Sequence, residues 1–239
     1  MSDQRFVHAW LLRLDPTWRR RVVEERRADL DAFCAAAART DARLTQHTYS
    51  TIGLRAEGDL LLWRMAESLE AVEETAADLI GSGIGRWLIP SISMIGLTRP
   101  SQYVKRPTTQ EQSLFSGERS RYLVVYPFTK SVEWYLAPAE ERQAVMRGHM
   151  KVGHAYPQVR QLLAYSFGLD DQEFIVAYET DDLVAFQDLV RELRETESRR
   201  STVRDTPIIT AIHRPLGDIL GLLAGPSDLM STPADGGGA

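Results

Sequence analysis

The chain has 239 residues and a mass of 27.0 kDa, a length that accommodates one large domain or two small ones. Hydrophobic residues make up 44% and charged residues 26% of the chain, which excludes a disordered or fibrous protein. Lys and Arg number 28 against 33 Asp and Glu, giving a formal net charge of −5, so the basic character of a nucleic-acid-binding protein is absent. An anionic ligand therefore has to be held by a local basic pocket.

The number of cysteines and the length of the longest apolar run give an expectation for the cellular compartment of the protein. Cys34 is the only cysteine, so the chain cannot form an internal disulfide, and no charged-then-apolar leader opens it. The longest apolar run, residues 87–98, is shorter than the roughly 20 residues that a membrane helix needs. We therefore expect a cytoplasmic protein with no membrane span.

The chain contains an internal repeat. Residues 59–79 and 173–193 each show a strand pattern, an acidic break and an amphipathic helix pattern, 114 positions apart. The same register pairs residues 8–14 with residues 122–128. Each copy then contains, in order, strand, helix, strand, strand, helix and strand, which predicts two four-stranded antiparallel sheets with helices on one face of each.

The predicted elements follow in chain order. In the first copy they are a strand at 6–14, a helix at 18–38, strands at 48–55 and 60–66, a helix at 69–80 and a strand at 91–98. In the second copy they are a strand at 121–129, a helix at 139–156, strands at 159–167 and 173–178, a helix at 182–199 and a strand at 207–213. Gly168 in the second hairpin suits a turn with positive φ.

These elements predict an α+β fold in which the open faces of the two sheets pack on each other, because each sheet alone would leave an apolar face in water. We expect an N-terminal half at 5–104, a polar connector and candidate lid at 105–120, and a C-terminal half at 121–215. The Gly- and Pro-containing tail at 225–239 is expected to be disordered.

Two histidines lie in the predicted helix 139–156. His149 and His154 are five positions apart, about 500° of helical rotation, so their rings point about 140° away from each other and cannot share one metal ion. The three-and-four spacing of apolar residues places His149 on the apolar side. A lone histidine there is more often a core or interface residue. However, Met150 is flexible and Gly153 has no side chain, so the surface beside the ring is adaptable and uncrowded. A flat macrocycle could lie there, and haem iron takes a single neutral imidazole as its proximal ligand.

The strand segment 126–130 places Tyr126 and Lys130 on one face, about 13 Å apart, which is comparable with the width of a porphyrin. Pro127 cannot donate a ladder hydrogen bond, so the segment is expected at an edge or a bulge. By itself this pattern also fits a half-buried strand with a snorkelling lysine at its end.

Several short segments occur together in the order found in one family. They are YPFTK at 126–130, EWY at 133–135, SFGLDD at 166–171, ETDDL at 179–183, and, in the first half, GLRA at 53–56, DLLLW at 59–63 and RPSQY at 99–103. Together with the spacing of Met146 and His149, they make residues 5–215 resemble the chlorite dismutase family. The resemblance extends to its coproheme decarboxylase branch, also called hydrogen-peroxide-dependent haem synthases.

The resemblance implies duplicated ferredoxin-like units that form a dimeric α+β barrel, with haem in the C-terminal half and a pentameric homo-oligomer. It implies that His149 is the axial iron ligand. Tyr126 matches the tyrosine whose radical abstracts hydrogen from a substrate propionate, and Lys130 matches the lysine that binds that propionate or supplies a proton. Trp134 matches a tryptophan on the proximal side, and Arg194 an arginine near the propionates.

The distal position separates branches of the family. Gln161 stands where chlorite dismutases carry an arginine and one group of decarboxylases carries a glutamine. A glutamine can hydrogen-bond a ligand but brings no charge to an anion such as chlorite, and Arg160 alternates to the opposite face of the strand. Where relatives have a glutamate bonded to the proximal histidine, this chain offers Glu197 or Ser198.

The leading hypothesis is therefore an enzyme that converts iron-coproporphyrin III (coproheme) into haem b with hydrogen peroxide. Its cofactors are haem and iron, with coproheme as the substrate and haem b as the product. Lys105 and Arg106 on the connector are further candidates for holding the anionic substrate. Chlorite dismutation or general haem peroxidase activity is the second hypothesis. A non-catalytic barrel that binds haem or another porphyrin is the third.

Overall fold

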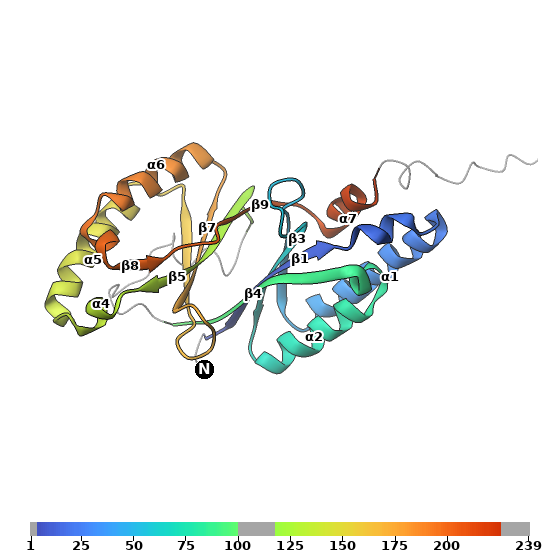
Figure 1. Ribbon diagram of the computed structural model, residues 1–239, viewed down its shortest axis with the longest axis horizontal. Coiled ribbons are helices and arrows are strands. Elements are labelled where there is room, and N and C mark those ends of the chain that lie inside the picture. The colour runs from blue at the N-terminus through green and yellow to red at the C-terminus, as the bar shows by residue number, and fades with distance from the viewer. Residues whose placement is uncertain (1–3, 100–117, 226–239) are drawn as a thin grey trace, which may run out of the picture. The chain divides into compact units, whose positions relative to one another are not determined.

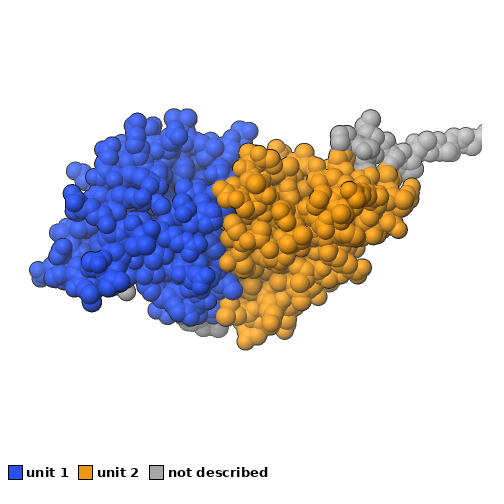
Figure 2. Space-filling view, in the orientation of Figure 1, with its two compact units in different colours: residues 1–7, 94–213 blue, residues 8–93, 214–239 orange. Residues whose placement is uncertain are grey.

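The computed structural model describes residues 4–99 and 118–225 (Figure 1). Over these residues the chain adopts an α+β fold with a large antiparallel sheet. It divides into two compact units (Figure 2): unit 1 comprises Met1–Val7 and Met94–His213, and unit 2 comprises His8–Ser93 and Arg214–Ala239. Within the described ranges, no helix has the length and apolarity needed to cross a bilayer.

Two segments singled out in the sequence lie almost wholly outside the described residues. They are the connector at 105–120, with Lys105 and Arg106, and the tail at 225–239.

Unit 2 holds the strand order β4-β1-β3-β2. Its strands are β2 (Thr45–Ser50), β3 (Leu60–Ala66), most of β1 (Phe6–Leu14) and the first part of β4 (Leu88–Thr98). Its helices are α1 (Val23–Asp41), α2 (Leu69–Gly81), α7 (Leu216–Ala224) and the 3-10 helices η1 (Pro16–Arg20) and η2 (Gly83–Trp87). Large buried side chains, among them Trp10, Trp18 and Phe33, fill the space between strands and helices.

Unit 1 holds the strand order β6-β7-β5-β9, with β8 beside the end of β5. Its strands are β5 (Tyr122–Lys130), β6 (Arg160–Tyr165), β7 (Phe174–Thr180), β8 (Thr202–Arg204) and β9 (Ile209–His213). Its helices are α4 (Val132–Leu136), α5 (Ala139–His154), α6 (Leu183–Arg194) and the 3-10 helix η3 (Glu197–Ser201). Figure 1 shows α5 and α6 together on one side of these strands.

Two predicted helices differ from the structure by five residues at one end. The helix expected at 18–38 begins at Val23, because Asp15 caps the preceding turn by accepting a hydrogen bond from the Thr17 amide at 2.8 Å. The helix expected at 182–199 ends at Arg194, and the tighter η3 follows it. The sequence analysis did not predict α4, β8 or α7.

Strand β5 explains how Pro127 fits into a sheet. β5 pairs with β7 along residues 122–128, but with β9 only along 122–125, and its register shifts between Thr129 and Lys130. Pro127 therefore lies beyond the end of β9, next to a bulge, as its missing amide donor requires. The hairpin prediction is also confirmed, since Gly168 has φ of 70° between β6 and β7.

Candidate functional site

Helix α5 turns one stripe of half-buried residues toward its unit. None of its 16 residues is fully buried, although the helix is amphipathic. His149 lies on this stripe, as the spacing predicted, and His154 is exposed. The apolar members of the stripe are Val145, Met146, Met150 and Val152. A helix of this length that buries nothing fully leaves apolar surface that the protein itself does not cover.

The imidazole of His149 is held from one side. Its Nδ1 lies 3.2 Å from the Ser198 hydroxyl oxygen on η3, 49 positions along the chain. Burial, and to a smaller extent repulsion from the Lys130 ammonium, lowers the pKa of His149 to about 4, so the ring is neutral at physiological pH. Among the described residues, Nε2 has no hydrogen-bond partner. One nitrogen fixed by a hydroxyl and one neutral nitrogen left open is the arrangement of a metal-ligating histidine.

Ser198 also ties Lys130 to this histidine. The Lys130 ammonium donates to the Ser198 carbonyl oxygen at 2.8 Å, and it lies 4.6 Å from the centre of the Trp134 ring. Lys130 is only 8% exposed, and its pKa falls to about 8 because of burial and the nearby Arg199. The structure thus brings three predicted residues, Lys130, Trp134 and His149, into one cluster around Ser198.

Tyr126 and Gln161 lie on the sheet of unit 1. Gln161 on β6 is directly opposite Tyr178 on β7, and the Tyr178 ring lies 6.2 Å from the Tyr126 ring on β5. Burial raises the pKa of both phenols above its ordinary value, so both are protonated at neutral pH. Tyr178 therefore joins two predicted catalytic residues, although the sequence analysis did not single it out.

Arg160 points to the other face of β6, as predicted. Its guanidinium Nη2 lies 2.9 Å from the Glu179 carboxylate, and Arg119 reaches the same carboxylate at 3.5 Å. Glu179 is 0% exposed, so this arginine pair neutralises a fully buried charge. Arg160 is therefore engaged away from Gln161.

Arg194 and Glu197 are placed at the surface. Arg194 pairs with Asp205 at 3.0 Å, and Arg199 pairs with the same carboxylate at 2.6 Å. Glu197 pairs with Arg200. Of the two candidates for the partner of His149, the structure places Ser198 there and not Glu197.

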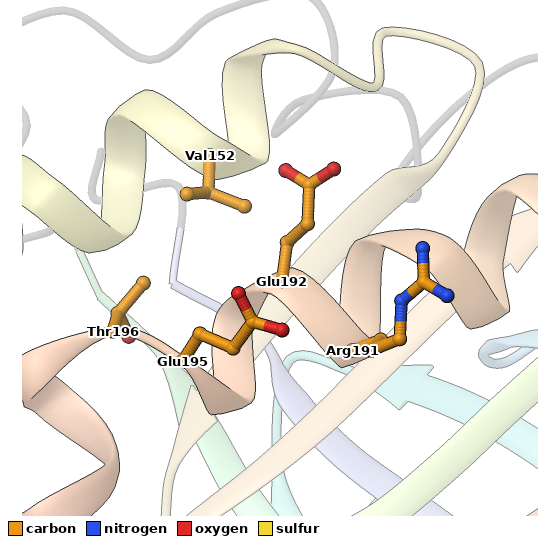
Figure 3. Close-up of a pocket in the computed structure, with 5 residues that line it drawn as sticks. All are labelled: Val152, Arg191, Glu192, Glu195 and Thr196. Carbon is orange, nitrogen blue, oxygen red and sulfur yellow. The ribbon is translucent and has the colours of Figure 1, made fainter.

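Figure 3 shows a separate pocket between α5 and α6, with a volume of about 620 Å³. Its lining residues are Val152, Arg191, Glu192, Glu195 and Thr196. The Tyr156 hydroxyl donates to Glu192 at 2.6 Å. Two carboxylates and one guanidinium do not suit a polyanion, and no predicted site residue lines this pocket.

The residues present fit a haem-type group. Leu163, on the same face of β6 as Gln161, is 42% exposed although it lies within the sheet, and Phe128 on β5 is only half-buried. Tyr126 and Phe128 pack in one hydrophobic cluster with Val152, which lies one helical turn after His149. Within residues 4–99 and 118–225, no group of three or more His, Cys, Asp or Glu could hold a metal ion. A metal here would be ligated by a single imidazole in apolar surroundings, as haem iron is.

One neutral, half-buried imidazole with an open ring nitrogen can serve as the ligand of haem iron. Comparison with known families agrees, because a family model described as chlorite dismutase matches residues 20–214. The chain belongs to the chlorite dismutase family, and it is a haem-binding oxidoreductase.

Individual relatives support the same membership. The chain is similar to a coproheme decarboxylase of Mycolicibacterium smegmatis (strain ATCC 700084 / mc(2)155), with 37% identity over 164 residues, 68% of this chain and 70% of the relative. Among solved structures it is similar to the chlorite dismutase of Candidatus Nitrospira defluvii in complex with imidazole, with 26% identity and a TM-score of 0.84, covering 94% of this chain and 97% of that one. A mutant of that chlorite dismutase has 26% identity and a TM-score of 0.85, covering 92% and 96%.

Proposed function

We propose that this protein catalyses the peroxide-dependent oxidative decarboxylation of two propionates of coproheme, giving haem b. The observation that carries the proposal is the combination of a neutral imidazole, His149, with a buried phenol, Tyr126, at the borders of one apolar cluster. The similarity to a coproheme decarboxylase over most of the chain supports the choice of substrate.

The reaction balances with one peroxide for each propionate. A propionic acid side chain and hydrogen peroxide give a vinyl group, carbon dioxide and two molecules of water. The bound iron porphyrin supplies the oxidising chemistry with peroxide, and the protein supplies ligation, positioning and exclusion of water.

The roles of the residues follow from their positions. His149 holds the metal through Nε2 while Ser198 orients its ring. Tyr126 would give up the hydrogen atom of its hydroxyl to the oxidising equivalents that peroxide supplies, with that hydrogen ending in water, and would then take a hydrogen atom from the propionate carbon chain. Gln161, on the same sheet face, can donate a hydrogen bond to a neutral ligand without bringing charge.

Three further side chains, those of Lys130, Trp134 and Arg194, have roles in binding the substrate. Lys130, with a pKa of about 8, can hold or release a proton near neutral pH, and Trp134 covers its ammonium. Arg194 is half-exposed and can exchange Asp205 for a propionate.

Tyr126→Phe tests the proposal. This variant keeps the ring and loses only the hydroxyl, so coproheme binding should change little while haem b formation stops. Full activity in the variant would remove Tyr126 from the mechanism. Tyr165→Phe is the matched control, because it removes another hydroxyl from the same sheet.

Chlorite dismutation is the second candidate, and the family assignment favours considering it. Gln161 is neutral, and Arg160 is bound to Glu179 on the opposite face, so no guanidinium of β6 is directed beside Gln161. We therefore expect slow oxygen release from chlorite at most. Sustained rapid oxygen evolution would favour chlorite dismutase, and tight porphyrin binding without loss of carboxyl groups would favour a carrier.

We further propose the architecture that accompanies this function in the family. The orders β4-β1-β3-β2 and β9-β5-β7-β6 follow one pattern, fourth, first, third and second, which supports two ferredoxin-like units, 5–104 and 121–215. A barrel, a homo-oligomeric ring and a cytoplasmic location are part of the same proposal.

A further inference from the structure

Tyr135 belongs to the EWY segment at 133–135, and the proposed mechanism gives it no role. It lies on α4, is 37% exposed, and donates its hydroxyl hydrogen to the Glu173 carboxylate at 2.5 Å. The same carboxylate oxygen accepts a hydrogen bond from the Lys130 amide at 2.7 Å, which fixes its position. An exposed phenol therefore has a proton acceptor held beside it.

A line of aromatic rings connects the candidate site with Tyr135. Phe128, which packs in the hydrophobic cluster with Tyr126, has its ring 6.2 Å from that of Phe174. The Phe174 ring lies 4.9 Å from the Phe167 ring, and the Phe167 ring lies 5.9 Å from the Tyr135 ring. Each separation is that of an aromatic pair in contact. Because electron transfer weakens steeply across empty gaps, these contacting rings favour the passage of an electron between Tyr135 and the site.

The charges beside two neighbouring aromatic side chains favour Tyr135 as the residue that is oxidised. Trp134 lies on the same helix, but the Lys130 ammonium is 4.6 Å from its ring centre. A cation at this distance raises the cost of removing an electron from the ring. At Tyr135 the neighbour is a carboxylate, which can take the hydroxyl proton as the electron leaves, so that no positive charge builds up on the ring.

The internal repeat separates the role of the carboxylate from that of the phenol. Residue 173 aligns with residue 59, and Asp59 accepts a hydrogen bond from the Leu14 amide at 2.8 Å. Glu173 makes the corresponding contact with the Lys130 amide, so a carboxylate holds the end of a strand in both units. The chain after β1 forms η1, whose residues Pro16–Arg20 include no tyrosine. The strand contact therefore does not require the phenol that unit 1 places beside its carboxylate.

We propose that Tyr135 is a surface oxidation site whose substrates are small hydrogen-atom donors in the solvent, such as ascorbate. When no propionate is left to oxidise, Tyr135 gives one electron, through the line of aromatic rings, to the oxidising equivalents that peroxide supplies at the bound porphyrin. Its hydroxyl proton moves to Glu173, which leaves a phenoxyl radical on Tyr135. This inference rests on the proposed function, which supplies the reaction of peroxide at the porphyrin.

The cycle closes when a donor returns one hydrogen atom to the phenoxyl oxygen of Tyr135. Glu173 then releases its proton to the solvent, and the formation of water from peroxide takes up an equal one. Two such cycles reduce one peroxide to two molecules of water and oxidise two donor molecules by one electron each. A donor too large or too polar for the buried site can be oxidised in this way, because Tyr135 is exposed.

The first test uses the porphyrin-free protein labelled with ¹³C at the ζ carbon of tyrosine. Glu173→Gln keeps an oxygen that can accept from the Lys130 amide but removes the carboxylate, so we expect the Tyr135 signal to shift. Glu192→Gln is the matched control, because Glu192 accepts a hydrogen bond from Tyr156 instead, and it should leave the Tyr135 signal unchanged. A Tyr135 signal that Glu173→Gln does not move would show that the hydrogen bond is absent and would overturn the proposal.

The second test adds peroxide and a nitroso spin trap to the protein loaded with haem b, and peptide mass spectrometry locates the trapped radicals. We expect an adduct on Tyr135 in wild type and about ten-fold less of it in Glu173→Gln, since a hydrogen bond to a charged group contributes on this scale. Phe167→Leu interrupts the line of rings at an exposed position and should also lower the yield, whether or not Glu173→Gln folds. Adducts confined to other tyrosines, or an undiminished Tyr135 adduct in either variant, would overturn the proposal.

The third test measures ascorbate oxidation by peroxide and the haem b-loaded protein. Tyr135→Phe should lose most of this activity, whereas Tyr156→Phe, which removes another hydroxyl bound to a carboxylate, should keep it. Equal rates in wild type and Tyr135→Phe would overturn the role of Tyr135. If wild type forms no haem b from coproheme, the proposed function fails, and radical trapping with haem b still decides whether Tyr135 is oxidised.

Discussion

Ser198 binds two of the predicted site residues with two different groups. Its hydroxyl contacts Nδ1 of His149, and its backbone carbonyl accepts the hydrogen bond of Lys130. A substitution of the side chain therefore removes the first contact and leaves the second. This separation makes the orientation of the imidazole testable by itself.

Ser198→Ala should weaken ferric porphyrin binding to the protein. Loss of the hydrogen bond to a ligating histidine typically lowers metal affinity by about 10- to 100-fold, and we expect the lower end of this range. Absorbance titration with coproheme measures the affinity. Ser201→Ala on the same η3 helix is the control, and equal affinity in wild type and Ser198→Ala would show that Ser198 does not orient the ring.

The protonation of His149 gives a prediction about pH. A free histidine has a pKa of about 6.5, whereas that of His149 is about 4, so between these values the folded chain binds fewer protons than the unfolded chain. Folded-state stability should therefore fall on acidification from pH 6.5 to 4, with no further contribution from His149 below that window.

Nitrogen NMR of the imidazole in the porphyrin-free protein measures this directly. We expect His149 to be neutral at pH 5.5. A half-protonated ring near pH 6.5 would contradict the burial that the structure shows, and Ser198→Ala serves as a comparison because it leaves Lys130 in place.

At this scale the sequence predicted the stripe of α5 and the separation of His149 from His154, since both depend on helical periodicity alone. It left Glu197 and Ser198 open, because their choice depends on the tight turn of η3 after Arg194. It missed Tyr178, because an inward-facing tyrosine in a strand pattern also fits an ordinary core.

At the scale of elements, the alternation of side chains along β6 places a neutral residue and a charged residue on opposite faces of the sheet. Gln161 lies on the face that carries Tyr178, and Arg160 lies on the face that carries Glu179. A shift of one residue in the β6–β7 register would exchange them. The buried contact of Arg160 with Glu179 is therefore expected to hold the register.

Arg160→Leu should lower the free energy of unfolding by about 2 to 3 kcal/mol, because it removes one partner of a buried carboxylate while Arg119 stays. Urea unfolding of the porphyrin-free protein measures this change. Arg191→Leu, which breaks an exposed pair with Asp188, should cost about 1 kcal/mol or less. Equal decreases in the free energy of unfolding in the two variants would show that the buried ion pair stabilises the fold no more than the exposed pair does.

Most elements were predictable because apolar periodicity decides strand or helix. The shift of the first helix to Val23 and the short α4 were not, because they depend on a cap at Asp15 and on the bulge after Thr129. The position of Pro127 was foreseen as an edge or bulge, and the early end of β9 is the reason.

At the scale of the molecule, the two units share a strand order but not a site. In unit 2 the histidine on β1, His8, is engaged at both ring nitrogens, Nδ1 by Arg64 at 3.2 Å and Nε2 by Ser93 at 2.9 Å. His8 is 5% exposed, and the buried core of unit 2 is filled by large side chains. The duplication of the sequence therefore does not predict duplication of the site.

We expect one porphyrin for each chain. In an absorbance titration with coproheme, the slope should change at one equivalent. This change of slope, the break, should be absent in His149→Ala. His8→Ala is the matched substitution in unit 2, and it should leave the break in place. A break at two equivalents would contradict the assignment of the site to unit 1.

Mass spectrometry of the bound porphyrin, before and after titration with peroxide, tests the central claim most directly. The account predicts that coproheme loses carbon dioxide and two hydrogen atoms twice in succession, one peroxide for each step, and ends as haem b. A porphyrin that keeps all its carboxyl groups while peroxide is consumed would contradict it.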